Sequence, residues 1–513
     1  MYLWRLCALL ASLLLLPSAG ESQQSSGSLL LRNATIYDGS GEAPFRGDVR
    51  ISGAQIVEVG PSLRQRSGEH VRDLNGMALA PGFIDMHSHA DSELLKVPDA
   101  EVAVRQGITT VLVGQDGGSE FPLSDFFANL EKLRPGINVA SMVGHATLRM
   151  QVLGKDLFRA ATADEIARMR SLAEQEMAAG AFGLSSGLEY EEAHFATTAE
   201  VVELARVAAR HGGFYISHVR DESNNVFASF RELVDIGAQS GLPAEITHIK
   251  LAAPPVLKQA AEKMPAIFAE AERRGVDLAA DVYPYTYWHS TLKVIVLDRD
   301  YFNREKVVKA IADNGGAERL RIAHFRLQPQ LENKTLAQIA GEWQVDPAEV
   351  FMRIVRMGEE AKDKEEADAT VLGESMVEED IRWFIAHPRI MFCTDGQLRG
   401  RHPRGAGAMP RILGRYVREQ RVIPLQEAIR KLTSLPASRL GLDDRGRISK
   451  GYIADLVIFD PARIADRSTI EEPLAPPAGI AAVIVGGAFA VENNKLTGVR
   501  NGQVLRRKAA SKR

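Results

Sequence analysis

The chain has 513 residues, of which 45% are hydrophobic and 25% charged, a composition typical of a folded globular protein and unlike that of a disordered or fibrous one. The formal net charge is −4, and no block of like charge stands out, which disfavours a nucleic-acid-binding protein. There are two cysteines, Cys7 and Cys393, so a scaffold held by several disulfides is excluded.

The first 20 residues have the pattern of a secretory signal peptide. Arg5 precedes an apolar run at residues 8–16, and Pro17 and three small residues follow it. The alternative is a membrane anchor, but the run is shorter than the ~20 residues that a spanning helix needs. We therefore expect residues 1–20 to be removed on export, Cys7 with them. The mature chain would be periplasmic or secreted, with no stable membrane association.

Both ends of the mature chain contain short strand-like runs separated by glycine-containing turns. The runs lie at residues 29–31, 34–37, 48–51, 55–59, 454–459, 481–485 and 502–505. We expect residues 21–80 and 441–513 to form one small β-sandwich domain together.

Residues 81–440 alternate apolar runs with segments of helical periodicity. Thr162 and Glu165, and again Thr197 and Glu200, have the spacing of a capping box at a helix start. The apolar runs lie at residues 82–86, 110–113, 138–143, 181–184, 214–216, 245–246, 276–280 and 390–392. This alternation predicts an α/β fold, a (β/α)₈ barrel of the TIM type. Residues 298–380 break the rhythm, and we expect a helical insertion before the eighth strand.

Metal-binding side chains follow four of the predicted strands. His87 and His89 follow the first, His218 the fifth, His248 the sixth and Asp395 the eighth. In a barrel the C-terminal strand ends meet at one mouth, and residues i and i+2 of an extended segment point the same way. A single histidine there is more often a hydrogen-bonded wall residue. Five such groups together indicate a metal site, and imidazole donors suit Zn²⁺ better than Ca²⁺ or Mg²⁺.

Several motifs resemble one enzyme family. The segment from Pro81 to His89, Pro-Gly-Phe-Ile-Asp-Met-His-Ser-His, resembles the opening metal motif of the amidohydrolase superfamily. Members of that superfamily are metal-dependent hydrolases built on a (β/α)₈ barrel with an appended β-sandwich. More narrowly, the chain is similar to the N-acyl-D-amino-acid deacylase (D-aminoacylase) family from about residue 29 to 505. The motifs that carry this similarity are at residues 180–190, 217–222, 247–250, 281–285, 394–396 and 410–418.

The resemblance implies the metal ligands. It assigns His218 and His248 to one site, and His87, His89 and Asp395 to a neighbouring one. The family usually has a metal-binding cysteine in the turn after the second strand, whereas here Asp116 occupies that position between Gln115 and Gly117. A carboxylate can replace the thiolate and can even bridge two ions, but it is a harder donor. The alternative for Asp116 is an ordinary turn residue. The resemblance thus implies one or two Zn²⁺ ions, with another divalent metal possible.

A catalytic role follows for Asp395, and a substrate-binding role for several other residues. Asp395 can accept a proton from the attacking water and return it to the departing amine. Lys250, Arg220 and Arg404 are cations placed to pair with a substrate carboxylate. The family similarly implicates the lysine, an arginine near Arg404 and a tyrosine of the segment that contains Tyr283 and Tyr285. Arg220 has the alternative of an ion pair with Asp221 or Glu222. Glu189 can line the pocket, and the alternative is a packing residue without a role in binding.

The sequence therefore predicts an exported, metal-dependent hydrolase that cleaves N-acyl-D-amino acids to a carboxylate and a free D-amino acid. Its partner would be this small substrate and no nucleic acid. Alternative enzymes on the same scaffold act on cyclic amides, unusual dipeptides or N-acyl-L-amino acids. A metal- or ligand-binding barrel without activity is the non-enzymatic alternative. The family resemblance also implies that the insertion covers the mouth as a lid. The oligomeric state is left open.

Overall fold

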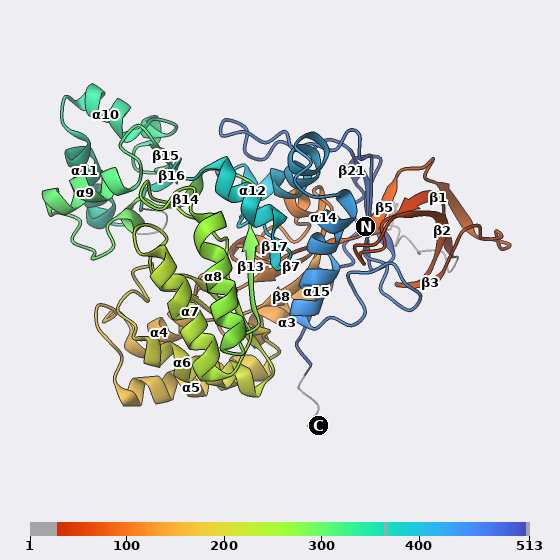
Figure 1. Cartoon of the computed structure of the whole chain (residues 1–513), viewed down its shortest axis with the longest axis horizontal. Helices are drawn as coiled ribbons and strands as arrows, with labels where there is room; N and C mark the ends of the chain where they lie inside the picture. The colour runs from red at the N-terminus through yellow and green to blue at the C-terminus, as the bar shows by residue number, and fades with distance from the viewer. Residues whose placement is uncertain (1–27, 364–366, 509–513) are drawn as a thin grey trace, which may run out of the picture.

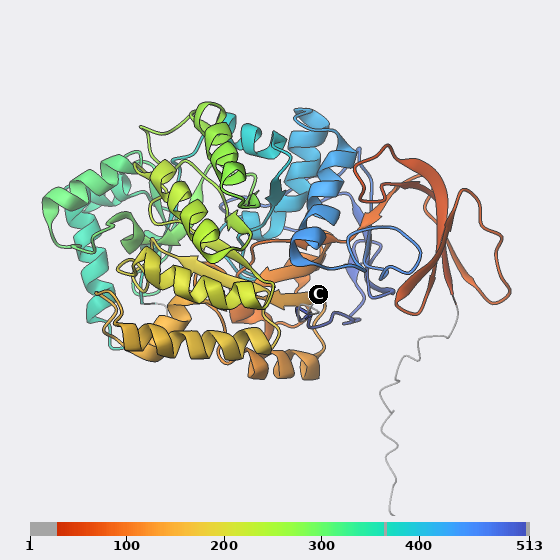
Figure 2. The ribbon, with the colours of Figure 1, turned by 60° about the horizontal axis from the view of Figure 1, so that its bottom comes forward.

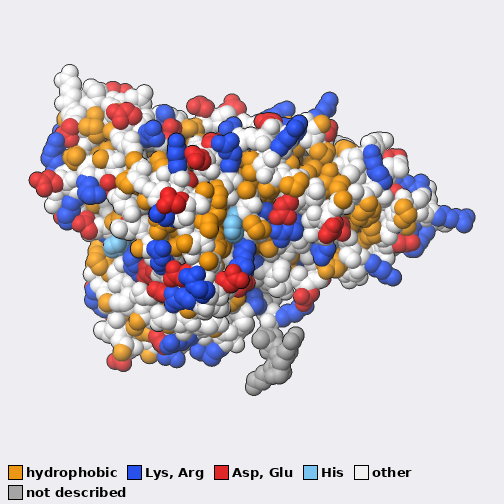
Figure 3. All heavy atoms as spheres, viewed as in Figure 1, with side chains coloured by type: hydrophobic (Ala, Val, Ile, Leu, Met, Phe, Trp, Pro, Cys, Tyr) orange, Lys and Arg blue, Asp and Glu red, His pale blue; other side chains and the backbone are white. Residues whose placement is uncertain are grey.

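The structure is a computed structural model that describes residues 28–363 and 367–508. The expected signal peptide, residues 1–20, lies outside the described residues. Within them, no helix is long and apolar enough to cross a membrane. Figure 1 and Figure 2 show three parts: a central barrel, an insertion at one end and a β-rich domain at the other. On the face in Figure 3, acidic and basic side chains are interspersed.

The central part has eight strand positions arranged in a ring. Parallel pairing runs through β6, β7 and β8, and through β9, β10, β11, β12, β13 and β17. β8 and β9 are two halves of one strand, with Met142 between them, and they connect the two sheets. Beyond β17 and β6, the Asp395 N–H donates to the His87 carbonyl at 2.8 Å. The strands are β6 (Phe83–Asp85), β7 (Ile108–Val113), β8 (Asn138–Ser141), β9 (Val143–Gly144), β10 (Gly183–Gly187), β11 (Phe214–His218), β12 (Ala244–Ile246), β13 (Leu278–Val282) and β17 (Ile390–Phe392).

The prediction of a (β/α)₈ barrel is confirmed, and each of the eight apolar runs coincides with one of these strand positions. Helices surround the strands, and several bury an apolar stripe against them; α7, for example, buries Val226, Phe230 and Val234 at helical spacing. The main outer helices are α3 (Leu123–Leu133), α4 (His145–Leu153), α5 (Ala163–Ala178), α6 (Thr198–Arg210), α7 (Val226–Ser240), α8 (Ala260–Arg273), α12 (Glu378–Ala386) and α14 (Leu425–Leu432). Smaller ones are α1 (Asp91–Leu94), α2 (Glu101–Val104), α13 (Arg404–Arg411), the π-helical η3 (Ile412–Glu419) and α15 (Ser434–Leu440).

One of the two expected capping boxes is complete and the other is half made. At α5, the Thr162 side chain accepts from the Glu165 N–H and the Glu165 carboxylate accepts from the Thr162 N–H. At α6, Thr197 accepts from the Glu200 N–H, but the Glu200 carboxylate turns inward. It is buried against His145 at 2.9 Å and Arg149 at 2.6 Å, so a charged partner inside the fold has displaced the cap. His145 is thus a hydrogen-bonded wall residue.

The insertion between β13 and β17 contains a small sheet as well as helices. Its strands pair antiparallel in the order β14, β16, β15, and its helices lie on the outer side of the molecule (Figure 1). It begins at Trp288, about ten residues earlier than the sequence suggests, because the strand-like segment at 288–291 is short. Its elements are β14 (Trp288–Thr291), η1 (Leu292–Ile295), α9 (Arg304–Asp313), β15 (Leu320–His324), η2 (Pro329–Leu331), α10 (Leu336–Trp343), α11 (Pro347–Glu360) and β16 (Thr370–Gly373).

The two chain ends share one nine-stranded sheet, in the order β21, β20, β19, β18, β5, β1, β2, β3, with β4 paired to β1. β18 from the C-terminal part pairs antiparallel with β5 from the N-terminal part. Asp455 fastens this domain to the barrel, because its Oδ2 accepts from Nδ2 of Asn138 on β8 at 2.9 Å. The strands are β1 (Leu29–Ile36), β2 (Phe45–Ser52), β3 (Gln55–Gly60), β4 (His70–Asp73), β5 (Ala78–Pro81), β18 (Leu456–Phe459), β19 (Ile480–Val485), β20 (Ala488–Glu492) and β21 (Lys495–Leu496).

A buried ion pair stabilises this domain. Nε of Arg50 on β2 donates to Oε1 of Glu69 at 2.6 Å, and both side chains are almost fully buried. Burial disfavours the Glu69 carboxylate, but hydrogen bonds from Arg50, the Arg66 N–H and Ser28 outweigh it and lower its pKa from 4.5 to about 2. Because the folded-state pKa is lowered, the stabilisation is complete above pH 4.5 and is lost as the pH falls towards 2.

We expect Glu69→Gln to reduce the free energy of unfolding at pH 7 by about 3 kcal/mol, because the buried Arg50 charge loses its counter-charge. Thermal unfolding of wild type and variant between pH 2 and 7 measures it, and the difference in Tm should shrink below pH 4.5. Glu58→Gln is the control, because Glu58 contacts the same Arg50 but is 41% exposed. It should cost less than about 1 kcal/mol. A Tm difference for Glu69→Gln that does not vary with pH contradicts this prediction.

Candidate metal centre

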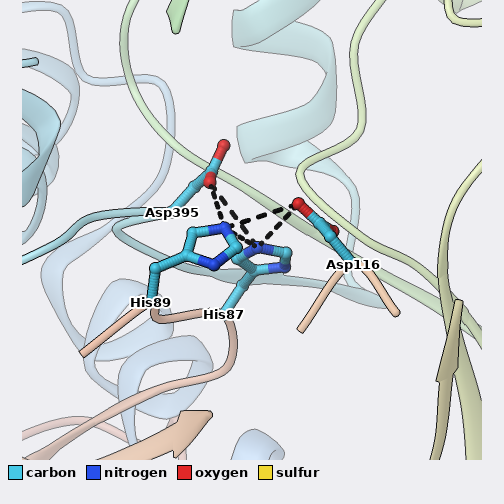
Figure 4. A group of neighbouring side chains, drawn as sticks. All are labelled: His87, His89, Asp116 and Asp395. Atoms are coloured by element: carbon cyan, nitrogen blue, oxygen red, sulfur yellow. Dashed lines mark hydrogen bonds and ion pairs between the residues drawn. The ribbon is translucent and has the colours of Figure 1, made fainter. Parts of the chain in front are cut away.

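Six predicted metal-binding side chains meet at the C-terminal end of the barrel. His87 and His89 follow β6, Asp116 follows β7, and Asp395 follows β17. His218 ends β11 and His248 follows β12. Figure 4 shows the rings of His87 and His89 lying between the carboxylates of Asp395 and Asp116. The structure therefore brings together all the residues that the sequence assigns to the metal.

Four of these side chains form a first donor group: His87, His89, Asp116 and Asp395. Nε2 of His87 and Nε2 of His89 are 3.2 Å apart. Oδ2 of Asp116 lies 3.6 Å and 3.4 Å from these nitrogens, and Oδ1 of Asp395 lies 3.5 Å and 3.3 Å from them. A tetrahedral zinc ion with ligands at ~2.0–2.1 Å separates its donors by about 3.3 Å. The group therefore has the size of a tetrahedral metal site.

Three side chains form a second donor group: Asp116, His218 and His248. Nδ1 of His218 is 3.0 Å from Nε2 of His248, which in turn is 3.3 Å from Oδ1 of Asp116. Three protein donors leave a fourth position for water or substrate, as in catalytic zinc sites. The Tyr190 hydroxyl lies beside this group, 3.1 Å from Nδ1 of His218.

Three of the six residues have a strained backbone. Asp116, His248 and Asp395 have φ values of +54°, +33° and +48°, in the left-handed region that non-glycine residues rarely adopt. Such conformations cost about 1–3 kcal/mol each and occur where the surrounding structure imposes them. Buried carboxylates hold two of these segments: Asp281 accepts from the His248 N–H at 2.8 Å, and Asp85 accepts from the N–H of Thr394, which precedes Asp395, at 2.8 Å.

The second ring nitrogen of three histidines is also held. Nδ1 of His87 contacts Oγ1 of Thr247, and Nε2 of His218 lies 2.7 Å from Oε2 of Glu189. Nδ1 of His248 lies 2.7 Å from Nζ of Lys250. Partners of this kind fix the orientation and tautomer of metal-binding imidazoles.

The centre is electrostatically suited to a cation. Burial disfavours the charged forms, but the Arg404 guanidinium and the histidines hold the pKa of the Asp395 carboxyl well below its usual range. Asp116 and Asp395 in turn overcome burial and raise the pKa of His89 to about 10. Two buried carboxylates thus stabilise positive charge at this point, and a divalent ion supplies it in place of protons.

The substrate-binding candidates fall into two sets. Arg404 and Lys250 line the cavity above the donor groups, as does Glu189. Nη1 of Arg404 is 2.6 Å from Oδ2 of Asp395, and Nζ of Lys250 donates to both Glu222 oxygens at 2.7 and 2.8 Å. Lys250 is therefore already paired with a carboxylate, whereas Glu189 holds His218 in place.

Arg220 and the two tyrosines are placed differently from the expectation. Arg220 makes a two-point ion pair with Glu232 on α7, at 2.8 and 2.9 Å, which directs its guanidinium away from the cavity. Arg220 therefore forms an ion pair, as the alternative interpretation of the sequence held, but its partner is Glu232 and not Asp221 or Glu222. The Tyr285 hydroxyl faces Ser468 at 3.4 Å, outside the cavity walls formed by the described residues. The Tyr283 ring lies 4.7 Å under the Arg404 guanidinium, so it supports that arginine from below.

Sequence reasoning missed three residues of this centre. Glu222 was considered only as a partner for Arg220, yet it binds Lys250 and lies 3.2 Å from Nδ1 of His248. Asp85 belongs to the first metal motif, but its role in joining the first and eighth strands is visible only in three dimensions. His289 comes from β14 of the insertion, and its buried Nε2 has no hydrogen-bond partner among the described residues. No spacing signal links His289 to the barrel motifs.

One cavity of about 650 Å³ opens above the donor groups. The insertion supplies much of its wall, including Trp288, His289, Val294 and Ile295. This volume is in the range that holds a small organic ligand. Because the donor groups lie at its base, a molecule bound in the cavity would meet the metal directly.

The chain is similar to known proteins over nearly its whole length. The model of the amidohydrolase family matches residues 70–491. The D-aminoacylase of Alcaligenes xylosoxydans xylosoxydans is 35% identical over 515 residues, which cover 96% of this chain and 100% of that protein. An N-acyl-D-glutamate deacylase from Bordetella bronchiseptica, solved with zinc and a phosphonate mimic of the tetrahedral intermediate, is 32% identical with a TM-score of 0.82. That match covers 93% of this chain and 99% of the other. A structure of D-aminoacylase with a binuclear metal centre is 33% identical, with a TM-score of 0.81 and the same coverage.

We expect Glu189→Gln to weaken Zn²⁺ binding by roughly 10–100-fold, because a neutral amide orients His218 less firmly than a carboxylate. Competition with a chelator of known affinity measures the change. The control is Glu192→Gln, which should leave the affinity unaltered. Glu192 is a nearby glutamate outside both donor groups and, unlike Glu189, is not grouped with His218. Equal zinc affinity in wild type and Glu189→Gln would show that the carboxylate does not support this ligand.

Proposed function

This chain belongs to the amidohydrolase family, and we propose that it uses zinc to hydrolyse the amide bond of N-acyl-D-amino acids. The products are a carboxylate and a free D-amino acid. The observation that carries the proposal is the presence of two metal-donor groups and Arg404 in one cavity. The relatives named above, a D-aminoacylase and an N-acyl-D-glutamate deacylase, support the substrate class.

The donor residues fit a divalent metal on their own geometry. The first group has the edge lengths of a tetrahedral site, and Oδ1 of Asp116 is buried with no hydrogen bond from any described residue. His87, His89, Asp116 and Asp395 would hold one ion, and Asp116, His218 and His248 a second. When bound, a divalent ion lowers the pKa of water and polarises a carbonyl group.

Asp395 is placed to move the proton of the reaction. One carboxylate oxygen faces His87 and His89, and Arg404 holds the other. In amide hydrolysis the water oxygen bonds to the carbonyl carbon while Asp395 takes the water proton. Asp395 then delivers that proton to the amide nitrogen as the C–N bond breaks, so one group acts as base and then as acid. The Tyr190 hydroxyl, beside the second donor group, can donate to the carbonyl oxygen as negative charge develops there.

The substrate carboxylate is best met by Arg404 and His289. Both line the cavity, and Nε of Arg404 and Nε2 of His289 are buried nitrogens without partners among the described residues. A buried donor without an acceptor is costly, and a carboxylate oxygen would satisfy it. Lys250 contributes less directly, since Glu222 already neutralises it. The insertion thus supplies part of the recognition, through His289.

A substrate panel tests the proposal. With zinc-loaded protein, we expect kcat/KM for N-acetyl-D-amino acids to exceed that for the L-enantiomers by at least tenfold. Hydantoins and dipeptides should be poor substrates. Replacing the free carboxylate of the best substrate by a carboxamide should lower kcat/KM by a further tenfold or more, because a charge-assisted pair worth about 1.5–3 kcal/mol is lost. Turnover confined to L-substrates or to cyclic amides would refute the proposed substrate class.

We further propose that residues 1–20 direct export and are then removed, which leaves the mature enzyme in the periplasm or the medium. The support is the order of Arg5, the apolar run at 8–16 and the small residues before position 21. Cell fractionation with N-terminal sequencing tests this, and we expect a chain that begins near residue 21 in the exported fraction. A full-length chain that stays in the cytosol contradicts it.

A further inference from the structure

The segment between β10 and α6, residues 188–197, carries two residues of the metal centre. Nε2 of His218 lies 2.7 Å from Oε2 of Glu189, and the Tyr190 hydroxyl lies 3.1 Å from Nδ1 of the same ring. The segment consists of turns and is neither helix nor strand, so no regular ladder of hydrogen bonds fixes its carbonyls. The positions of Glu189 and Tyr190 therefore depend on what else holds this backbone.

Three arginines hold the backbone of this segment. Each donates a hydrogen bond to one of its main-chain carbonyls: Arg149 to Glu192, Arg220 to His194 and Arg299 to Glu189. The first two also make ion pairs with the barrel helices α6 and α7. Arg299 comes from the insertion, so it connects that part of the molecule to the residue that holds His218 in place.

The Arg299 guanidinium is buried, because only 8% of the residue is exposed. It donates to the carbonyls of Val296, at 3.3 Å, and of Glu189, and its Nε has no hydrogen-bond partner among the described residues. Burying a charge against neutral carbonyls is costly, and a buried arginine is usually found with a carboxylate partner. A contribution to stability does not account for this arrangement, whereas a role in holding Glu189 does.

The backbone at Arg299 ties the residue to the cavity wall. Its φ of +64° is in the left-handed region, which non-glycine residues rarely adopt and which persists where neighbouring contacts impose it. The Arg299 N–H donates to the Val296 carbonyl at 3.1 Å, and Val296 lines the cavity above the donor groups. Arg299 therefore joins a wall residue of the insertion to the backbone that carries Glu189 and Tyr190.

We propose that Arg299 is a positioning residue, through which the insertion holds Glu189 and Tyr190 in place beside His218. The hydrogen bond to the Glu189 carbonyl fixes the backbone from which both side chains start. One of them orients the His218 ring, and the other donates to the substrate carbonyl oxygen. A displacement of about 1 Å in such groups can slow a reaction by ~10²-fold. The inference rests on the proposed function where it concerns rate, and on the metal centre alone where it concerns zinc affinity.

Zinc affinity, measured by competition with a chelator and without any substrate, tests this role. Arg299→Met keeps an unbranched side chain but removes every donor. We expect it to weaken zinc binding by about three- to tenfold, less than the ~10–100-fold of a direct partner of a ligand, because Arg299 acts through Glu189. The matched control is Arg304→Met, since Arg304 lies in the same insertion but pairs with Asp346 at the surface and is 56% exposed. It should bind zinc as wild type does, and equal affinity in Arg299→Met and wild type overturns the proposal.

A double variant separates positioning from a general loosening of the fold. If Arg299 acts on zinc through Glu189, then Arg299→Met should cause little further loss of affinity in a Glu189→Gln protein, because the two residues belong to one chain of contacts. Loss by the same factor in both backgrounds contradicts the proposal. Circular dichroism of the metal-free proteins checks that each is folded. Arg299→Lys keeps the charge and one donor group, so it should bind zinc with an affinity between those of Arg299→Met and wild type, and it replaces Arg299→Met in the comparison if that variant does not fold.

Turnover of an N-acetyl-D-amino acid by the zinc-saturated proteins gives the second readout. The Tyr190 hydroxyl acts as charge develops on the carbonyl oxygen, so its displacement in Arg299→Met should lower kcat by about tenfold and change KM by less than about threefold. An unchanged kcat with a raised KM would place Arg299 in substrate binding and overturn its positioning role. Wild-type protein that binds zinc but hydrolyses no N-acyl-D-amino acid would refute the proposed function, while the zinc affinities would still decide the role of Arg299.

Discussion

The structure depends on one electrostatic constraint: two carboxylates, Asp116 and Asp395, are buried among four imidazoles at the mouth of the barrel. Burial alone would raise their pKa values, but His87 and His248 hold the pKa of Asp116 below its usual range, and Arg404 with the histidines does the same for Asp395. A divalent cation held between the carboxylates and the rings would be stabilised by the same two negative charges. Much of the surrounding architecture serves this arrangement. It includes the left-handed backbone at three ligands, and the inner carboxylates Asp85 and Asp281, which hold the backbone beside Asp395 and at His248.

The barrel converts a sequence pattern into this constraint. Ligands that are separated by more than 300 residues in the chain meet because the C-terminal ends of parallel strands face one mouth. The metal-binding candidates could therefore be predicted from the sequence. Apolar runs located the strands, and the residue type at each strand end gave the chemistry. The family resemblance added Asp116, whose position after β7 no spacing argument would have singled out.

The predictions were weakest where a side chain had a choice of partner. Arg220 was expected in the substrate pocket, but Glu232 on α7 offers it a two-point ion pair, and the sequence does not show that this helix passes close by. Tyr285 turns towards Ser468 for the same kind of reason. His289 could not be found because it reaches the cavity from the insertion, whose small sheet is formed by strands far apart in sequence. The position of a strand end can be predicted from the local sequence pattern. The partner of a side chain depends on which elements pack beside it in three dimensions.

The barrel supplies the residues for chemistry, and the insertion supplies residues for substrate recognition. The barrel supplies both donor groups and Arg404, while the insertion supplies His289 and the apolar wall that includes Val294 and Ile295. The central claim is that metal ions held by the strand-end ligands carry out amide hydrolysis. Its most direct test is the hydrolysis of an N-acetyl-D-amino acid by protein stripped of metal and then titrated with Zn²⁺. We expect activity to vanish on stripping and to return as the sites fill with zinc, and full activity in the metal-free protein would contradict the account.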